Sequence, residues 1–209
     1  MISYEKNIEN MYREPAYATG GGTRRTAWDI EWQDEPFAAS DAAVVSPLKL
    51  PSLLKDIWET GVPSEEAAVY IHVPFCQLSC TYCAFFKKKA DEKGQHEYAK
   101  LLCREIDALA GRPYLARSRV RSVFFGGGTP GILAAEDMER ILERIRTVFP
   151  LMEHAEITME SSLSDMTDEK MDAAISGGVN RFSFGVQSFQ TKIRNGIGRP
   201  LPREQAMER

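Results

Sequence analysis

Residues 68–83 read AVYIHVPFCQLSCTYC, and they decide how the rest of the chain is interpreted. The first six residues form a short apolar run that ends at Pro74, which is typical of a buried strand. Three cysteines follow at once, Cys76, Cys80 and Cys83, with the spacing C-x3-C-x2-C. We therefore expect a strand that is followed directly by a short loop carrying three thiols.

The alternation of apolar strand and helix continues along the chain. Periodicity and breakers predict further strands at 120–125, 155–159 and 181–186, and helices at 98–109, 138–148 and 167–175. Repeated strand-helix units imply right-handed crossovers and a parallel sheet. Each strand is followed by polar or glycine-rich residues, and ligands of parallel α/β folds bind at that edge. The sequence predicts an α/β fold with its chemistry at the carboxyl ends of the strands.

The residues before this pattern give little periodicity and several breakers. Gly20-Gly21-Gly22 indicates a loop and does not meet the requirements of a phosphate loop. A short helix is predicted at 53–60. We therefore divide the chain into an N-terminal arm of unknown role, residues 1–66, and a core, residues 67–209.

Composition and charge limit the kinds of partner and the cellular location that we expect. The 209 residues carry a net charge of −4, which gives no reason to expect nucleic acid or an anionic membrane as partner. The first fifteen residues include five charged side chains and no apolar core of a signal peptide. No stretch approaches the apolar length of a membrane span. We expect a cytoplasmic protein with no membrane span.

The cysteine loop is the strongest chemical signal. Without an export signal, clustered cysteines indicate metal binding before disulfide formation. Three thiolates on so short a loop can ligate three irons of a [4Fe–4S] cluster and leave the fourth iron open. The alternative is a structural zinc site, which needs a closed set of four ligands, with Cys103, His96 or His72 as the fourth. Cys103 lies on the apolar side of its helix, which favours a buried small hydrophobe.

Four ordered motifs make the sequence resemble a known family. They are YIHVPFC at 70–76 with the cysteine loop, FFGGGTP at 124–130, ITME at 157–160 and NRFSFGVQSF at 180–189. Together they resemble radical S-adenosylmethionine (SAM) enzymes of the oxygen-independent coproporphyrinogen III oxidase-like group. The resemblance covers roughly residues 67 to 209. It implies a partial (β/α)6 radical SAM barrel, truncated after about four β/α units, with the cluster at its open mouth.

The resemblance also implies a chemistry. SAM would bind the open iron through its amino and carboxylate groups, and one electron from the cluster would break its carbon–sulfur bond. The resulting 5′-deoxyadenosyl radical would abstract hydrogen from the substrate. The protein would supply position and exclude water, and an electron donor such as flavodoxin or ferredoxin would reduce the cluster.

The family's cofactor positions can be carried over residue by residue. Cys76, Cys80 and Cys83 would hold the cluster, and the SAM-binding residues would be Tyr70, Tyr82, Gly127, Gly128, Thr129, Glu160, Gln187 and Arg199. The glycines would let the backbone approach SAM, or form only a tight turn. Glu160 would accept hydrogen bonds from the ribose, or be an exposed salt-bridging carboxylate. Arg199 would pair with a SAM carboxylate. No catalytic residue is assigned beyond these.

The aromatic and second-cofactor positions are less specific. Tyr70 and Tyr82 would pack on the cluster and the adenosyl group, although a tyrosine in a strand is often plain core. The best-known members of the group bind a second SAM near the first. Its positions are matched here by Tyr82, Gly128, Thr129, Gln187 and Arg199. Two bound SAM molecules are therefore a hypothesis for this chain.

The group contains three tetrapyrrole activities, and small differences favour one. Coproporphyrinogen oxidases carry a further cysteine where this chain has Phe85. CAFF at 83–86, NRFSF at 180–184 and KIR at 192–194 resemble the heme-utilisation (HutW-like, anaerobilin synthase) branch. Its substrate would be heme, opened by radical methyl transfer with SAM as radical source and methyl donor. The alternatives are an oxygen-independent coproporphyrinogen III oxidase-like dehydrogenase and a non-catalytic heme chaperone.

The resemblance places two further barrel strands and a substrate-binding domain beyond Arg209. A bare edge strand in a parallel sheet is an aggregation risk. We therefore expect these residues to be a fragment that is poorly active alone. The substrate itself rests on analogy, because its determinants would lie in the absent part.

Overall fold

The computed structural model describes residues 46–63, 66–84, 88–89 and 91–209. From Pro47 onward they belong to one compact unit, Pro47–Arg209. The predictions made for residues 1–45, including the glycine run at 20–22, and for Phe85 lie outside the described residues. The proposed boundary between arm and core after residue 66 stays a prediction.

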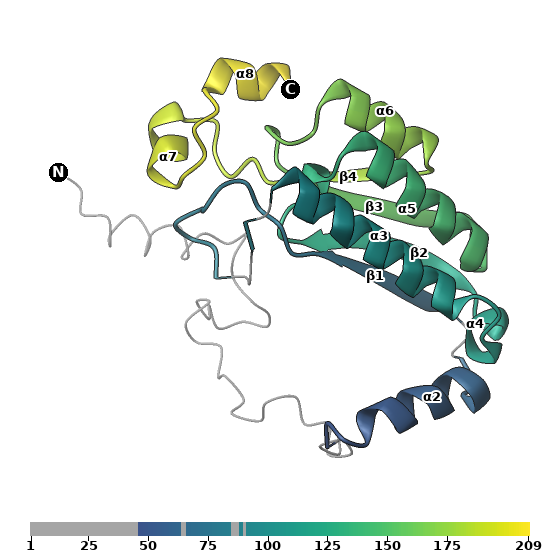
Figure 1. The fold of residues 1–209 in the computed structure, drawn as a ribbon. Coiled ribbons are helices and arrows are strands. Elements are labelled where there is room, and N and C mark those ends of the chain that lie inside the picture. Colours follow the sequence, from purple (N-terminus) through teal and green to yellow (C-terminus); the bar gives the residue numbers. More distant parts are fainter. Residues whose placement is uncertain (1–45, 64–65, 85–87, 90) are drawn as a thin grey trace, which may run out of the picture. The chain divides into compact units, whose positions relative to one another are not determined.

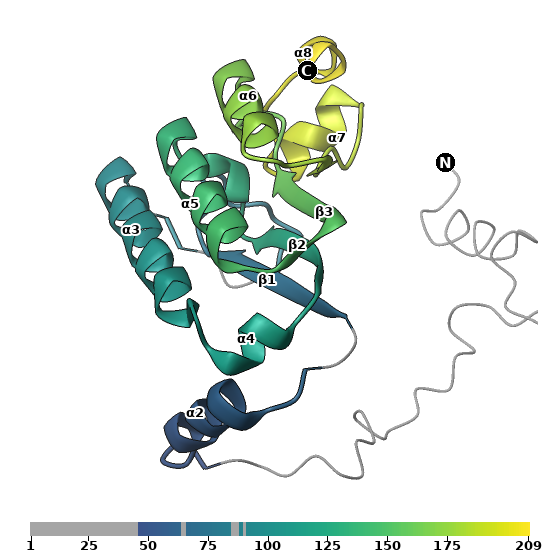
Figure 2. The same cartoon turned by 90° about the vertical axis from the view of Figure 1, so that its right-hand side faces the viewer.

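A parallel sheet forms the centre of this unit (Figure 1). Its strands are hydrogen-bonded in sequence order: β1 (Ala67–Val73), β2 (Val120–Gly127), β3 (Leu151–Ser161) and β4 (Arg181–Phe184). The connecting helices are α3 (Glu92–Leu109), α5 (Ala135–Val148) and α6 (Asp168–Ser176). All three cover the same face of the sheet, as Figure 2 shows from the side. The predicted α/β fold with a parallel sheet is confirmed.

Several short elements add to the predicted ones. The helix predicted at 53–60 is α2 (Leu50–Thr60). The sequence did not indicate α4 (Pro113–Arg117), the 3-10 turn η3 (Pro130–Ile132), α7 (Thr191–Gly196) or α8 (Arg203–Glu208). Elements of three to six residues are too short to show a helical period. None of the helices in the described ranges is long and apolar enough to cross a membrane.

Strand β4 is two residues shorter than predicted. It ends at Phe184, where the amide of Val186 turns back to donate to the carbonyl of Phe184 at 2.9 Å. The next residue, Gln187, has a φ of 65°, which no strand can contain. The end of β4 is therefore set by a turn that carries a predicted site residue.

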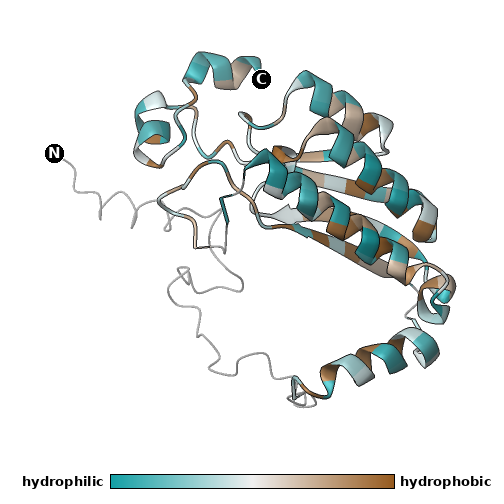
Figure 3. Ribbon diagram, in the orientation of Figure 1, coloured by the Kyte–Doolittle hydropathy of each residue, from teal (hydrophilic) through white to brown (hydrophobic). Residues whose placement is uncertain are grey.

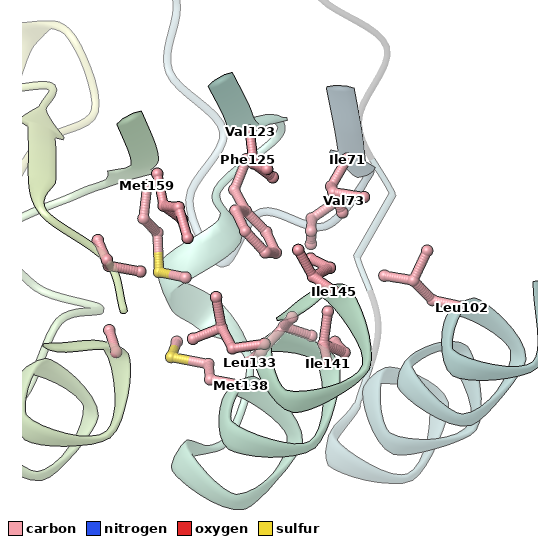
Figure 4. Close-up of a cluster of buried hydrophobic side chains, with 14 of the residues drawn as sticks. Ile71, Val73, Leu102, Val123, Phe125, Leu133, Met138, Ile141, Ile145 and Met159 are labelled. Carbon is pink, nitrogen blue, oxygen red and sulfur yellow. The ribbon is translucent and has the colours of Figure 1, made fainter. Parts of the chain in front are cut away.

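The hydrophobic core lies between the sheet and the helices. Residues alternate across β1, so that Ile71 and Val73 are buried while Tyr70 and His72 are exposed on the other face. Figure 4 shows side chains of the strands pointing toward those of α3 and α5: Ile71, Val73, Val123, Phe125, Met159, Leu102, Met138, Ile141 and Ile145. Hydrophilic and hydrophobic residues alternate around both helices (Figure 3). One face of the sheet is thus covered by helices, and none of the helices in the described ranges that connect the strands covers the other, which we call the open face.

A side-chain cap begins α3, and a polar side-chain contact joins this helix to α5. The Asp91 carboxylate accepts a hydrogen bond from the amide of Gly94 at the start of α3. The buried Asp137 in the first turn of α5 lies 2.8 Å from Nδ1 of His96 on α3. These contacts hold α3 and α5 in register above the sheet.

Candidate functional site

The cysteine loop begins where β1 ends. The amide of Cys76 donates to the carbonyl of Lys88 at 3.2 Å, and the amide of Lys88 donates to the carbonyl of Pro74 at 2.7 Å. These two bonds close the base of the loop. Within it, the amide of Cys83 donates to the carbonyl of Cys80 at 3.2 Å. Cys76, Cys80 and Cys83 are free and half-buried, so that all three thiols are available on one closed loop.

The glycine loop after β2 packs against the end of β1. The amide of Gly128 donates to the carbonyl of Val73 at 2.7 Å. A Cβ added at Gly128 would lie 2.4 Å from the carbonyl oxygen of Phe75, and one at Gly127, whose φ is +111°, 2.8 Å from the His72 ring. Glycine is therefore required at both positions by close packing against the end of β1 and Phe75. The approach of this backbone to SAM stays a prediction.

A pocket of about 230 Å³ opens between these loops and the ends of β3 and β4. Cys83 lines it, together with seven of the eight residues predicted to bind SAM: Tyr82, Gly127, Gly128, Thr129, Glu160, Gln187 and Arg199. Thr129 also connects the pocket to the cysteine loop, because its Oγ1 lies 3.4 Å from Sγ of Cys76. The structure thus brings residues from four separate motifs to one place.

Five pocket residues were missed by the sequence reasoning: Ser161, Ser162, Ser183, Phe184 and Gly185. Two of them follow from the pairing of β3 with β4, which places Ser183 beside Glu160 and Phe184 beside Ser161. A parallel register extended from the ITME motif to the NRFSF motif could have found them. Their residue types alone carry no distinctive signal.

The hydroxyl of Tyr82 is the meeting point of the pocket's polar side chains. Nε2 of Gln187 donates to it at 2.6 Å, and Nη2 of Arg199 donates to it at 3.3 Å. Nε of Arg199 is buried and lacks a hydrogen-bond partner within the described residues. Burial lowers the pKa of this guanidinium. The interactions with Tyr82 and Cys80 raise it by more, so that the net shift is upward. Arg199 therefore remains a cation with an unused donor, which suits a carboxylate ligand.

Gln187 holds its place in an unfavourable backbone conformation. Among the described residues other than glycine, it is the one with a positive φ, 65°. For an L-residue this left-handed conformation costs roughly 1–2 kcal/mol. Such strain persists only where the surroundings over-determine it, and it gathers at functional sites.

Glu160 is the second-last residue of β3 and lies in the wall of the pocket. Burial raises the pKa of its carboxyl group. It forms no ion pair with any residue that the structure describes. Glu160 is therefore not the exposed, salt-bridged carboxylate of the alternative interpretation. Its role toward a ribose stays a prediction.

Tyr70 is the predicted site residue that does not line the pocket. It lies on the open face of the sheet, with 57% of its surface exposed. Its hydroxyl is 3.1 Å from Nδ1 of His72, and its ring stacks on Phe124. The alternative interpretation made Tyr70 a plain core residue, and its exposure contradicts that. Its packing against a cluster stays a prediction.

The donor set fits an iron–sulfur cluster with an open corner. The three candidates for a fourth ligand are engaged elsewhere. Cys103 is buried in the core, as predicted, and burial raises the pKa of its thiol. His96 is paired with Asp137, and His72 with Tyr70. Within the described ranges, no three Cys, His, Asp or Glu side chains are placed to hold a single metal ion, the three cysteines of the loop included. Their part as cluster ligands therefore stays a prediction. Three thiols without a fourth protein ligand suit a cluster better than a closed zinc site.

Comparison with known families agrees with this geometry. The model of the radical SAM superfamily matches residues 70–209. The chain belongs to the radical SAM superfamily. Membership implies a [4Fe–4S] cluster and SAM as cofactors, and the cysteine loop and the adjoining pocket are built from residues that fit both.

The match to each individual relative covers only part of that relative's length. Anaerobilin synthase from Escherichia coli O157:H7 is 40% identical over 131 residues, which are 63% of this chain and 29% of that protein. The heme chaperone HemW from Bacillus subtilis (strain 168) is 36% identical over 136 residues, 63% of this chain and 35% of that protein. Our chain thus spans about a third of the length of these curated relatives.

A solved structure shows the same fold. Coproporphyrinogen III oxidase (HemN) from Escherichia coli, a radical SAM enzyme, superimposes with a TM-score of 0.62 at 27% sequence identity. The match covers 69% of this chain and 33% of that one. The predicted partial radical SAM barrel with four β/α units is confirmed.

Proposed function

We propose that this chain carries the cofactor site of a radical SAM enzyme that acts on a tetrapyrrole, with heme as substrate. The reaction is radical methyl transfer followed by ring opening. One observation carries the cofactor site: Gln187 and Arg199 converge on Tyr82 of the cysteine loop, beside a pocket lined by Glu160. The identity of 40% to anaerobilin synthase supports the branch.

Each side chain has a task in this proposal. Cys76, Cys80 and Cys83 hold the cluster, which when bound supplies the electron that cleaves SAM. The guanidinium of Arg199 binds a SAM carboxylate through Nε, the donor that is otherwise unused. Glu160 accepts hydrogen bonds from the ribose.

The remaining cofactor residues set orientation. Gln187 both donates and accepts hydrogen bonds at the rim of the pocket. Thr129, 3.4 Å from Cys76, orients that thiol. We further propose that Tyr82, Gly128, Thr129, Gln187 and Arg199 serve a second SAM.

The pocket of about 230 Å³ is lined by the residues assigned to the cofactor. The tetrapyrrole binds outside it in this proposal, within reach of the cofactor. A flavodoxin or ferredoxin is the proposed electron donor.

Two other functions have support of their own. The identity of 36% to a heme chaperone favours a protein that binds and transfers heme without catalysis. The structural match to HemN favours a coproporphyrinogen oxidase-like dehydrogenase. Phe85 stands against the latter, because those oxidases carry a cysteine there.

An anoxic assay separates the three. Reconstituted protein is mixed with heme, SAM and a reductant, and the products are identified by mass spectrometry. Methylated, ring-opened product supports the proposed enzyme, whereas unchanged and tightly held heme supports the chaperone. Loss of carboxylates from coproporphyrinogen in a parallel reaction contradicts both.

The cofactor site has a separate test that needs no substrate. Electron paramagnetic resonance (EPR) of the reduced, reconstituted chain is recorded with and without SAM. A cluster signal that changes on addition of SAM supports an open iron. Bound zinc, or a cluster signal indifferent to SAM, contradicts the proposal.

A further inference from the structure

Arg194 is a buried cation next to the pocket, although it does not line it. Only 2% of its surface is exposed, on the short helix α7. Nε donates to the carbonyl of Leu201 at 2.7 Å, and Nη1 donates to the carbonyls of Val186 at 2.6 Å and Ser188 at 3.1 Å. All three acceptors are main-chain oxygens. A buried guanidinium that donates only to main-chain carbonyls fixes the path of the backbone around it.

Two of these carbonyls flank Gln187. The bonds from one nitrogen, Nη1, to Val186 and Ser188 hold the carbonyl groups of the residues before and after Gln187, the residue with the left-handed φ of 65°. In that conformation the Gln187 side chain reaches the hydroxyl of Tyr82. Arg194 therefore opposes the relaxation of Gln187 to an ordinary backbone conformation, which would withdraw its amide from the pocket.

The other contacts of Arg194 lie around Arg199. The Arg199 amide donates to the carbonyl of Arg194 at 2.8 Å. The side chain of Arg194 donates to the carbonyl of Leu201, which lies two residues beyond Arg199. The same segment touches the cysteine loop. The amide of Thr81 donates to the carbonyl of Ile197 at 3.3 Å, and a Cβ at Gly198 would lie 2.9 Å from the carbonyl oxygen of Ser79.

We propose that Arg194 is a positioning residue for SAM, an inference that rests on the proposed function. Its guanidinium fixes segment 186–201 so that Gln187 and Arg199 meet at Tyr82. The planar fork matters as much as the charge, because its donors reach carbonyls on two sides at once. A lysine at this position keeps the charge and loses part of that geometry.

The test compares Arg194→Met and Arg194→Lys with Lys192→Met, which removes an exposed cation from the same helix. Each full chain is reconstituted anoxically, and three quantities are measured: iron and sulfide content, the EPR spectrum of the reduced cluster without SAM, and the dissociation constant of SAM. We expect Arg194→Met to bind SAM about tenfold more weakly, with wild-type iron content and SAM-free spectrum. Arg194→Lys should lie between it and wild type, and Lys192→Met should match wild type.

Two results overturn the inference. One is wild-type SAM affinity in Arg194→Met. The other is a parallel loss of iron, because that would show a general structural role. If Arg194→Met does not fold, Arg194→Lys carries the test: weaker SAM binding on an intact cluster supports positioning, and unchanged binding contradicts it. Failure of the proposed function is distinct, because SAM would then leave the wild-type spectrum unchanged.

Discussion

The side-chain amide of Gln187 donates a hydrogen bond of 2.6 Å to the hydroxyl of Tyr82, although 105 residues separate the two in the chain. This bond joins the turn after β4 to the cysteine loop after β1. Arg199 donates to the same hydroxyl. The loop that carries the three cysteines and two of the predicted cofactor-binding side chains are therefore joined at one hydroxyl group.

We predict that Tyr82→Phe weakens SAM binding and leaves the cluster in place. The change removes the common acceptor of Gln187 and Arg199 but keeps the ring. Loss of hydrogen bonds of this kind corresponds to roughly a tenfold weaker affinity, measurable by equilibrium dialysis. Tyr114→Phe is the matched control, because Tyr114 lies in α4 with its ring against Trp58 of α2, outside the pocket lining. Equal affinities for the two variants would contradict the role of Tyr82.

Replacing the cysteines one at a time should separate ligands from core. Cys76→Ala, Cys80→Ala and Cys83→Ala are expected to lose the cluster absorbance and most of the bound iron after reconstitution. Cys103→Ala should keep both, because Cys103 is only 6% exposed in the core between α3 and its neighbours. It should lower the free energy of unfolding by about 1–2 kcal/mol. Retention of iron by any of the first three variants would remove that residue from the ligand set.

The glycine loop gives a prediction about stability. In Gly128→Ala the new Cβ would lie 2.4 Å from a main-chain oxygen of Phe75, so that strand end and loop must move apart. We expect a loss of about 1–3 kcal/mol in urea unfolding, as for overpacked interiors. Gly196→Ala is the control, because a Cβ there meets nothing within 4 Å. It should be neutral or slightly stabilising within α7.

Glu160 should make SAM binding depend on pH. Burial raises the pKa of its carboxyl group above 4.5, so that the free protein holds a proton to higher pH than an exposed glutamate does. If Glu160 binds the ribose as proposed, its ionised form accepts stronger hydrogen bonds from the hydroxyls than its neutral form does. SAM affinity should therefore rise as pH rises through this raised pKa, with release of a proton on binding that calorimetry in two buffers can detect.

The control for this pH dependence lies on the same strand. Glu160→Gln should bind SAM more weakly, with an affinity that no longer changes over that pH range. Glu156→Gln should keep the wild-type profile, because Glu156 is exposed, its contacts are Thr158 and Arg181, and these contacts lower its pKa. A wild-type profile in Glu160→Gln would show that another group titrates.

Much of the fold could be predicted from local pattern. A short apolar run ended by Pro74 identified β1, and helical spacing of apolar residues identified α3 and α5, because a buried face leaves its pattern in the sequence. Glycines that stop the helix helped to identify α6. The short helices α4, α7 and α8 left no such pattern. Helices of five or six residues are unstable alone and depend on tertiary contacts such as those of Arg194.

The sequence predicted which residues belong to the candidate site, but not which of them contact one another. The sequence analysis named eight residues of the pocket lining, whereas it mentioned Arg194 only within the KIR triplet of one branch. Its burial and its three carbonyl partners depend on how the chain folds back at Leu201. The glycines were expected to make room for a cofactor, whereas the structure shows them first making room for Phe75 and His72.

By itself, the sequence determined the order of strands and helices and the spacing of three thiols on one loop. Both are local properties, set by burial period and by the number of residues between cysteines. Only the tertiary structure decided that Tyr82 meets Gln187 and Arg199 while Tyr70 stays apart on the open face of the sheet. Such meetings join residues more than a hundred positions apart, and they arise from strand register and loop packing, which no local pattern encodes.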